Sequence, residues 1–407
     1  MYKKCKITMG LRSYLNRIKP NFAPGGRFAK LHATFDAFET FLYTPNTVTK
    51  TGAHIRDVVD MKRTMITVVV ALLPALIFGM YNVGLQHVTM RGGTDFSFWQ
   101  LLGFGFLSML PTLVVSYVVG LAIEFGVAQV RGHEVNEGFL VTGLLIPMVL
   151  PIGVPLWMVA IATAFAVVFG KEVFGGTGMN IFNPALLARA FLFFAFPKSM
   201  SGDDVWVAGY GLFPAVDGFS GATPLSLSAA GLIEQLPAAS DLFLGTIPGS
   251  VGETSTLWIL VGGLILLLTG VASWRVMFTV FAGGYLMGLL LNFVGTTPYM
   301  TLPAHYHLLM GGFAFGAVFM ATDPVTSAQT RAGKLIYGFL IGVLIVVVRV
   351  LNPAYPEGTM LVILLMNAFA PLIDHVVVQR NINWRRARAL KVARAAIPTP
   401  DAKITKG

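Results

Sequence analysis

The chain has 407 residues, of which 55% are hydrophobic and only 12% are charged. This charged share is about half the usual one, and with a mean hydropathy of +0.72 it excludes a soluble globular protein. A formal net charge of +10 can indicate nucleic-acid binding. In so apolar a chain, however, we expect the Lys and Arg residues to set its orientation in a membrane.

The N-terminal region, residues 1–63, is basic. It holds 12 Lys and Arg residues and residues 375–407 hold another 8, so the two ends carry most of the 29 cations. We expect both ends in the cytoplasm. No signal peptide is recognisable, since the first long apolar run begins only near Thr64 and no small-residue cleavage site follows it. Cys5 is the single cysteine, which excludes an internal disulfide and a Cys-ligated iron–sulfur cluster within this chain.

Ten apolar runs follow, each long enough to cross a membrane if some are tilted or broken. Pro147 and Pro151 break the third, and Asn183-Pro184 opens the fifth. The sequence therefore predicts an all-α integral membrane protein with about ten transmembrane helices. The runs lie near residues 64–81, 98–124, 138–152, 156–174, 181–196, 256–272, 276–294, 306–321, 335–351 and 359–378.

These spans divide into two blocks of five, residues 64–196 and 256–378. A loop, residues 197–255, separates the blocks, and a basic tail, residues 379–407, ends the chain. Because five is odd, two repeats of five helices would be inverted, as in several transporter folds. With ten spans and both ends inside, the long loop faces outward, into the periplasm of a Gram-negative bacterium.

Three later spans carry a Gly-x-x-x-Gly pair, a spacing that lets helix backbones approach closely in lipid. We expect tight helix packing there; a flat surface for an aromatic ring or a partner subunit is the alternative. The pairs are Gly284/Gly288, Gly312/Gly316 and Gly338/Gly342.

The outward loop contains the run Asp217-Gly-Phe-Ser-Gly-Ala-Thr223. It resembles the sites at which a flavin transferase esterifies the phosphate of FMN onto a threonine hydroxyl. Small residues leave the backbone free around the acceptor, and Pro224 restricts the chain behind it. An ordinary Gly-Ser-Thr turn is the alternative, but the position of the run in an outward loop favours covalent FMN on Thr223. The recognition motif would consist of Asp217, Ser220, Gly221 and Ala222.

A second glycine-rich run, Gly175 to Pro184, lies between spans four and five. The hydroxyl of Thr177 and the amides of Asn180 and Asn183 are suited to bonding the polar edge of a flat isoalloxazine ring. A helix–helix turn with Asn capping explains the same residues, and both alternatives stay open. Arg189, within span five, is suited to pairing with an acidic residue or with a flavin phosphate or carbonyl.

Several acidic side chains lie at membrane depth or its border, where ionisable groups indicate function. Asp323, in the run Ala321 to Ala328, either lines a cation path or simply sits near water at a helix end. Glu137 and Asp374 fall on the inner side, where a cation would enter. For Glu124 and Glu172 an interfacial position is the simpler expectation.

Together these runs resemble the B-subunit family of the Na⁺-translocating NADH:quinone oxidoreductases, nearly end to end. The segments that carry the resemblance are His133–Phe139, Gly175–Leu187, Val216–Thr223, Ala321–Ala328 and Ala370–His375.

The resemblance implies a six-subunit complex of a bacterial inner membrane. It implies covalent FMN on Thr223, bound riboflavin, ubiquinone as electron acceptor and export of Na⁺. The implied partners are five other subunits, among them a periplasmic FMN subunit and an NADH-oxidising flavin and iron–sulfur subunit, together with the flavin transferase and the lipid bilayer. Glu137 and Asp374 match acidic positions implicated in sodium uptake. The Gly175–Asn183 run is our candidate for the riboflavin contacts. The chain itself carries no P-loop and no Rossmann fingerprint, so we do not expect it to bind NADH.

Two alternatives remain. The D-subunit of the Rnf electron-transport complex shares the ten spans and the threonyl-FMN motif, but it lacks a long basic N-terminal extension, which this chain has before Thr64. A passive channel or transporter of the urea-transporter type fits broken helices and inverted repeats equally well. The Thr223 motif argues against the second alternative, because a channel has no use for a flavin-transferase site.

Overall fold

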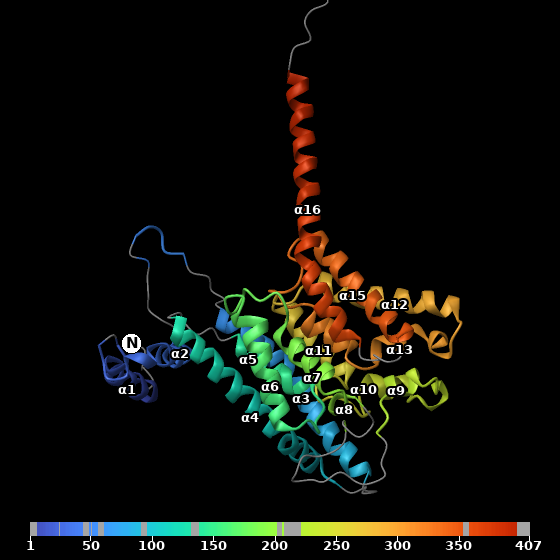
Figure 1. The fold of residues 1–407 in the computed structure, drawn as a ribbon, viewed down its shortest axis with the longest axis horizontal. Coiled ribbons are helices and arrows are strands. Elements are labelled where there is room, and N and C mark those ends of the chain that lie inside the picture. Colours follow the sequence, from blue (N-terminus) through green and yellow to red (C-terminus); the bar gives the residue numbers. More distant parts are fainter. Residues whose placement is uncertain are drawn as a thin grey trace, which may run out of the picture.

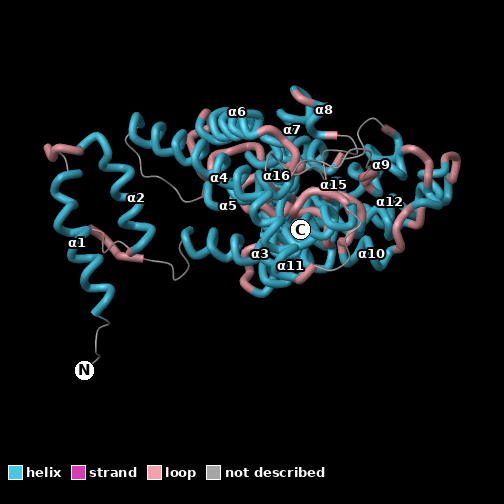
Figure 2. The backbone as a smooth tube through the Cα atoms, turned by 90° about the horizontal axis from the view of Figure 1, so that it is seen from below, coloured by secondary structure: helices cyan, strands magenta, loops and turns pink. Residues whose placement is uncertain are grey.

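The computed structural model describes residues 6–23, 25–43, 49, 51–55, 61–90, 96–131, 138–201, 206, 221–352 and 358–396. Over these residues every regular element is a helix and no strand occurs, which confirms the predicted all-α class (Figure 2). Within this described part of the chain, five helices are long and apolar enough to cross a membrane. They are α3 (Met61–Met90), α4 (Phe98–Arg131), α12 (Trp274–Val294), α15 (Arg331–Leu351) and α16 (Thr359–Ala396).

The other predicted spans coincide with shorter helices, so the count of ten spans and the inverted repeat stay predictions. These helices are α5 (Phe139–Val149), α6 (Leu156–Val167), α7 (Pro184–Ala195) and α11 (Thr256–Leu268). α6 continues into a π-helical turn, η2 (Val168–Glu172). The eighth span is divided into α13 (Ala304–Leu309), α14 (Phe313–Phe315) and a second π-helical turn, η5 (Gly316–Met320).

Proline and glycine set the breaks in these helices. α5 ends at Val149 because Leu150, which precedes Pro151, adopts an extended conformation. α7 begins at Pro184, where the side chain of Asn183 caps the helix. The breaks at Pro151 and Pro184 agree with the sequence prediction, whereas the predicted break at Pro147 is wrong, because this proline lies inside α5. The break in the eighth span follows from Gly311, which has a φ of +58°, a left-handed conformation that favours glycine, and whose hypothetical Cβ would collide with Leu225.

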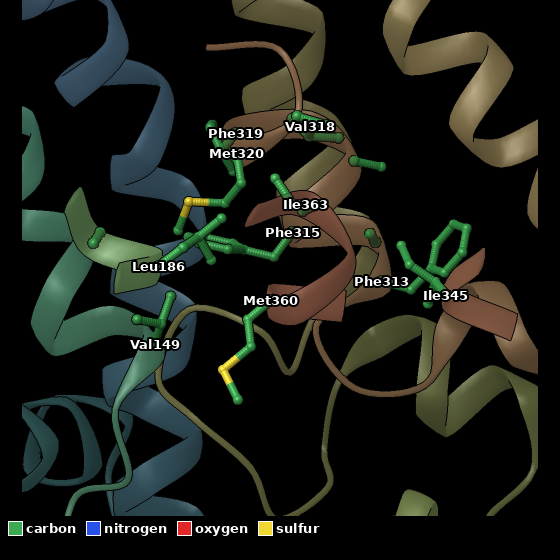
Figure 3. Close-up of a cluster of buried hydrophobic side chains, with 14 of the residues drawn as sticks. Val149, Leu186, Phe313, Phe315, Val318, Phe319, Met320, Ile345, Met360 and Ile363 are labelled. Atoms are coloured by element: carbon green, nitrogen blue, oxygen red, sulfur yellow. The ribbon is translucent and has the colours of Figure 1, made fainter. Parts of the chain in front are cut away.

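The membrane helices form one bundle with two distinct ends (Figure 1). We call one the tail end, because α16 projects from it far beyond the other helices. The loop end carries the short helices α8 (Pro197–Met200), α9 (Pro224–Ala229) and α10 (Ala239–Leu244). Between the ends lies an apolar core built from both blocks, in which Leu186 and Val149 face Phe315, Phe319 and Ile363 (Figure 3).

The N-terminal region contributes a helical hairpin beside the bundle (Figures 1 and 2). It consists of α1 (Lys6–Phe22), η1 (Ala29–Leu31) and α2 (His32–Leu42). Lys19 pairs with Glu39 at 2.7 Å, and the rings of Phe22 and Phe35 stack at 4.6 Å. Phe38 contacts Phe125 of α4, with ring centroids 6.1 Å apart, so α2 packs against the bundle.

The glycines of α12 and α15 lie where these two helices cross. A Cβ at Gly342 would collide with the backbone of Val280 and crowd that of Gly284, and one at Gly338 would collide with Thr279. The predicted close packing at the Gly-x-x-x-Gly pairs is therefore confirmed for this helix pair.

Replacing Gly342 by alanine should lower the stability of the detergent-purified protein by about 1–3 kcal/mol, because the added methyl group has no room against backbone atoms. Thermal unfolding followed by intrinsic tryptophan fluorescence measures the change. Gly103→Ala in α4 is the matched control, since its Cβ meets nothing within 4 Å. Equal melting temperatures for the two variants would contradict the tight crossing.

Candidate functional site

A cavity opens at the tail end, and both helix blocks contribute to its walls. The empty space, counting its open mouth, is about 830 Å³. It brings three predicted residues, Thr177, Asn180 and Asn183, to the same place as a fourth, Asp323. The other lining residues are Thr64, Met65, Val68, Gly138, Val141, Thr142, Leu145, Lys171, Pro184, Leu266, Val271, Ala272, Phe319, Thr322, Pro324 and Val325.

The turn that carries Thr177 depends on its glycines. Gly175, Gly176 and Gly178 have φ values of +118°, +99° and +88°, which side chains with a Cβ rarely adopt. The turn places Thr177 against Gly138, where an added Cβ would lie 2.7 Å from the Thr177 methyl group. The glycine-rich run is therefore a tight turn whose polar side chains border a cavity.

Asn183 performs the capping role and also reaches the second block. Its Oδ1 accepts hydrogen bonds from the backbone N–H groups of Ala185 and Leu186, at 3.0 and 3.4 Å. Its Nδ2 donates to Oδ2 of Asp323 at 3.3 Å. The capping alternative is thus observed, and the cofactor contact stays a prediction. Asp323 also accepts from the N–H of Val325 at 3.0 Å, so it is held on both oxygens at the cavity wall.

Asp374 lies outside the lining of this cavity and holds the loop that follows Asp323. Its carboxylate accepts from the backbone of Gln329 at 2.6 Å and from the N–H and hydroxyl of Thr330 at 2.9 and 2.5 Å. Gln329 in turn donates to the carbonyls of Pro324 and Ser327. The structure therefore shows Asp374 as an anchor of the Asp323 loop; its role in a sodium path stays a prediction. Glu137, the third predicted member of that path, lies outside the described residues.

Thr223 lies at the opposite, loop end. Its Oγ1 accepts from the N–H of Ser226 at 3.2 Å, so it caps α9, and Pro224 occupies the first helical position. Thr223 is half-buried and borders a pocket of about 390 Å³, counting its mouth, with Trp206, Ile247 and Glu253. Gly221 and Ala222 precede it in an irregular segment, whereas Asp217 and Ser220 lie outside the described residues.

Arg189 is buried at the loop end and does not border the tail-end cavity with Thr177, Asn180 and Asn183. Its guanidinium forms an ion pair with the carboxylate of Glu253. Ser250 donates to the other oxygen of Glu253 at 2.8 Å. The acidic-partner alternative for Arg189 is thus observed, and a flavin contact stays a prediction. Glu253 was not singled out by sequence, because it is 64 residues away and no local pattern marks it.

A second buried ion pair was also missed. Glu124 of α4 bonds Lys171 of η2, and both side chains are about 5% exposed or less. Glu172 is equally buried, and Arg131 donates to its carbonyl at 2.9 Å. Packing of α4 against η2 encloses both Glu124 and Glu172, and the expectation that they lie at the border of the membrane stays a prediction.

The two pockets are separated by apolar side chains. Phe315 and Phe319 lie in this partition with their ring centroids 5.1 Å apart (Figure 3). Phe319 also lines the tail-end cavity. Glu253 and Gly312 border both the Thr223 pocket and a smaller space around Phe315. Along α11, Thr256 at the loop end and Leu266 at the cavity are roughly 15 Å apart at 1.5 Å per residue.

Comparison with known proteins shows the family of this chain. The model of the NQR2, RnfD, RnfE family matches residues 48–383, and the chain belongs to that family. It is 49% identical to the B-subunit of a Na⁺-translocating NADH-quinone reductase from Ectopseudomonas mendocina, over 93% of this chain and 100% of that protein. Subunits of the same name from Azotobacter vinelandii and Chromohalobacter salexigens are each 48% identical, over 93% of this chain and 100% and 97% of theirs. The resemblance stated from the motifs is thereby confirmed.

Asp374→Ala should loosen the loop after Asp323, because three hydrogen bonds to the carboxylate are lost. Each is worth about 1 kcal/mol net, so the protection of the Gln329 and Thr330 amides should fall by roughly tenfold or more. Hydrogen–deuterium exchange measured on peptides covering 324–334 reports this directly. His375→Ala, an exposed neighbour on the same helix, should leave the exchange unchanged; similar exchange in both variants would disprove the anchoring role.

Proposed function

We propose that this chain is the flavin-carrying membrane subunit of a Na⁺-translocating NADH:ubiquinone oxidoreductase. It passes electrons between its two ends, from covalent FMN on Thr223 by way of riboflavin to ubiquinone, and this transfer is coupled to sodium export. Family membership and the names of its relatives support the class. The observation that carries the proposal is a pair of pockets at opposite ends of one bundle, each with polar side chains in an otherwise apolar wall, and an apolar partition between them.

The geometry at Thr223 fits attachment of FMN through a phosphoester. The capping bond uses Oγ1 as an acceptor, so the hydroxyl hydrogen is not needed for the fold and its replacement by phosphorus keeps an acceptor oxygen in place. The neighbouring Gly221 and Ala222 carry no bulky side chain next to the acceptor hydroxyl. We assign the recognition motif to Asp217, Ser220, Gly221 and Ala222.

The tail-end cavity fits the ring of riboflavin. Its walls include apolar side chains such as Val68, Leu145 and Phe319 for a flat ring, and polar side chains for the ring edge. Thr177 and Asn180 are the donors we assign to this edge, with Asn183 holding the turn. When bound, the flavin supplies electron carriage; the chain binds and orients it and excludes water.

Sodium coupling would use the acidic groups of the tail end. Added negative charge in a low-dielectric interior needs a compensating cation, and Asp323 is a carboxylate at the cavity wall. We assign cation entry to Asp323 with Glu137, and we assign Asp374 to this path through its hold on the Asp323 loop.

The proposed orientation puts the tail end in the cytoplasm and Thr223 in the periplasm of a bacterial inner membrane. The C-terminal part of α16 supports this orientation, because it is rich in Lys and Arg and cytoplasmic segments are enriched in both. Electrons would come from partner subunits of the six-subunit complex, because this chain has no NADH-binding motif.

Thr223→Ala should abolish covalent flavin, seen as loss of in-gel fluorescence of the denatured subunit and of the FMN mass on the peptide that contains residue 223. The lost cap destabilises only the short helix α9, by about 1 kcal/mol, so the bundle should still assemble. Thr246→Ala, an exposed threonine of the same outer segment, is the matched control and should stay fluorescent. A fluorescent Thr223→Ala subunit would disprove the attachment site.

Thr177→Val should weaken riboflavin binding by about 2- to 10-fold, the effect of losing one neutral hydrogen bond without changing the shape of the side chain. The measurement is the unphosphorylated riboflavin released on denaturation of the purified complex, relative to covalent FMN. Thr269→Val, a threonine near the end of α11 that does not line the cavity, serves as the control. An unchanged riboflavin content in Thr177→Val would remove this residue from the site.

A further inference from the structure

The buried ion pair of Lys171 and Glu124 forms part of the wall of the tail-end cavity. Lys171 is among the residues that line it, while Glu124 stands behind Lys171 on α4. A buried ion pair is a poor source of stability, because apolar side chains of similar size serve at least as well. Ionisable groups inside a membrane protein are therefore functional candidates, and this pair borders an empty space suited to a ligand.

Lys171 has hydrogen-bonding capacity left for a ligand. An ammonium group has three N–H donors. Among the described residues, the ammonium group of Lys171 donates one hydrogen bond, to Oε1 of Glu124. The side chain is almost fully buried, so bulk water does not satisfy the rest. The remaining donors are available to an acceptor inside the cavity.

Lys171 lies in an irregular part of the backbone. η2 is a π-helical turn, a feature found often at functional sites, and it carries Lys171 directly ahead of the turn with Thr177 and Asn180. The second π-helical turn in the described part of the chain, η5, carries Phe319 to the same cavity from the other block. The two irregular turns thus bring a cation and a ring to one cavity.

The surrounding charges define what Lys171 can bind. Glu124 bonds the ammonium, and Glu172 lies close enough to Glu124 to interact with it electrostatically. Asp323 lines the cavity from the other helix block. The remaining N–H donors of the ammonium group favour an electron-rich acceptor edge near Lys171. A planar heterocycle with carbonyl groups along one edge matches this pattern.

We propose that Lys171 is a ligand-binding residue that donates a hydrogen bond to a carbonyl oxygen of the isoalloxazine ring, and that Glu124 is the positioning residue that holds its ammonium group. The inference rests on the proposed presence of riboflavin in this cavity. Lys171 exchanges neither an electron nor a proton with the ring. Its positive charge stabilises the added electron density of the reduced ring, so it raises the midpoint potential of this flavin.

The test compares a neutral pair with conservative and distant variants in the purified complex. Lys171→Met with Glu124→Gln removes both charges, so neither is left buried without a partner. Equilibrium dialysis against riboflavin should show about 10- to 100-fold weaker binding, as expected for a charge-assisted hydrogen bond. With riboflavin in excess, spectroelectrochemical titration should show a lower midpoint potential for the non-covalent flavin. Lys171→Arg should preserve both values.

Lys198→Met, which removes the same charge at an exposed position of the loop end, should match the wild type in both measurements. Unchanged binding and potential in the neutral pair would overturn the inference. Should the neutral pair not assemble, Lys171→Gln with Glu124→Gln keeps hydrogen bonding and removes the charge; it must still lower the potential. A wild-type complex that contains no riboflavin, or whose bound azidoriboflavin labels no peptide covering 171–183 on illumination, would instead refute the proposed function.

Discussion

Irregular backbone at membrane depth is tolerated only where protein encloses it or where it lines a cavity, because lipid cannot satisfy free N–H and C=O groups. This constraint shapes the tail end. The chain leaves helical geometry after η2 and again after η5, and both interruptions border one cavity. The bond between Asn183 and Asp323 joins them across the two blocks. Each of these two side chains also accepts from backbone N–H groups of its own block, Asn183 from Ala185 and Leu186 and Asp323 from Val325.

Buried charged side chains also need partners within the protein, and the buried ion pairs at the two ends supply them. Lys171 pairs with Glu124 at the tail end, and Arg189 pairs with Glu253 at the loop end. Removing one member of such a pair leaves an uncompensated charge at a cost of about 3–5 kcal/mol, so these residues are fixed in position. Each pair also borders a pocket, and the apolar layer of Phe315, Phe319 and their neighbours keeps the pockets apart.

Local chemistry was predictable from the sequence, and long-range pairing was not. Asn183-Pro184 and Pro151 marked helix ends because caps and proline act on adjacent residues. The motif before Thr223 stood out for the same reason. The partner of Lys171 lies 47 residues away and that of Asp374 44 or 45 residues away, so only tertiary packing reveals them. Helix lengths were less predictable than positions, since Gly311 divides a span that looks continuous in hydropathy.

The length of α16 has a mechanical consequence. Pro371 removes one backbone hydrogen bond three residues before Asp374, so the helix bends most easily beside the residue that anchors the Asp323 loop. Beyond Asp374 the helix continues to Ala396, a rod of roughly 33 Å at 1.5 Å per residue, exposed along its described side chains (Figure 1). Such a rod acts as a lever with its pivot at the proline. A large swing of its tip becomes a small displacement at the Asp374 carboxylate, the scale on which hydrogen bonds to Gln329 and Thr330 are made or broken.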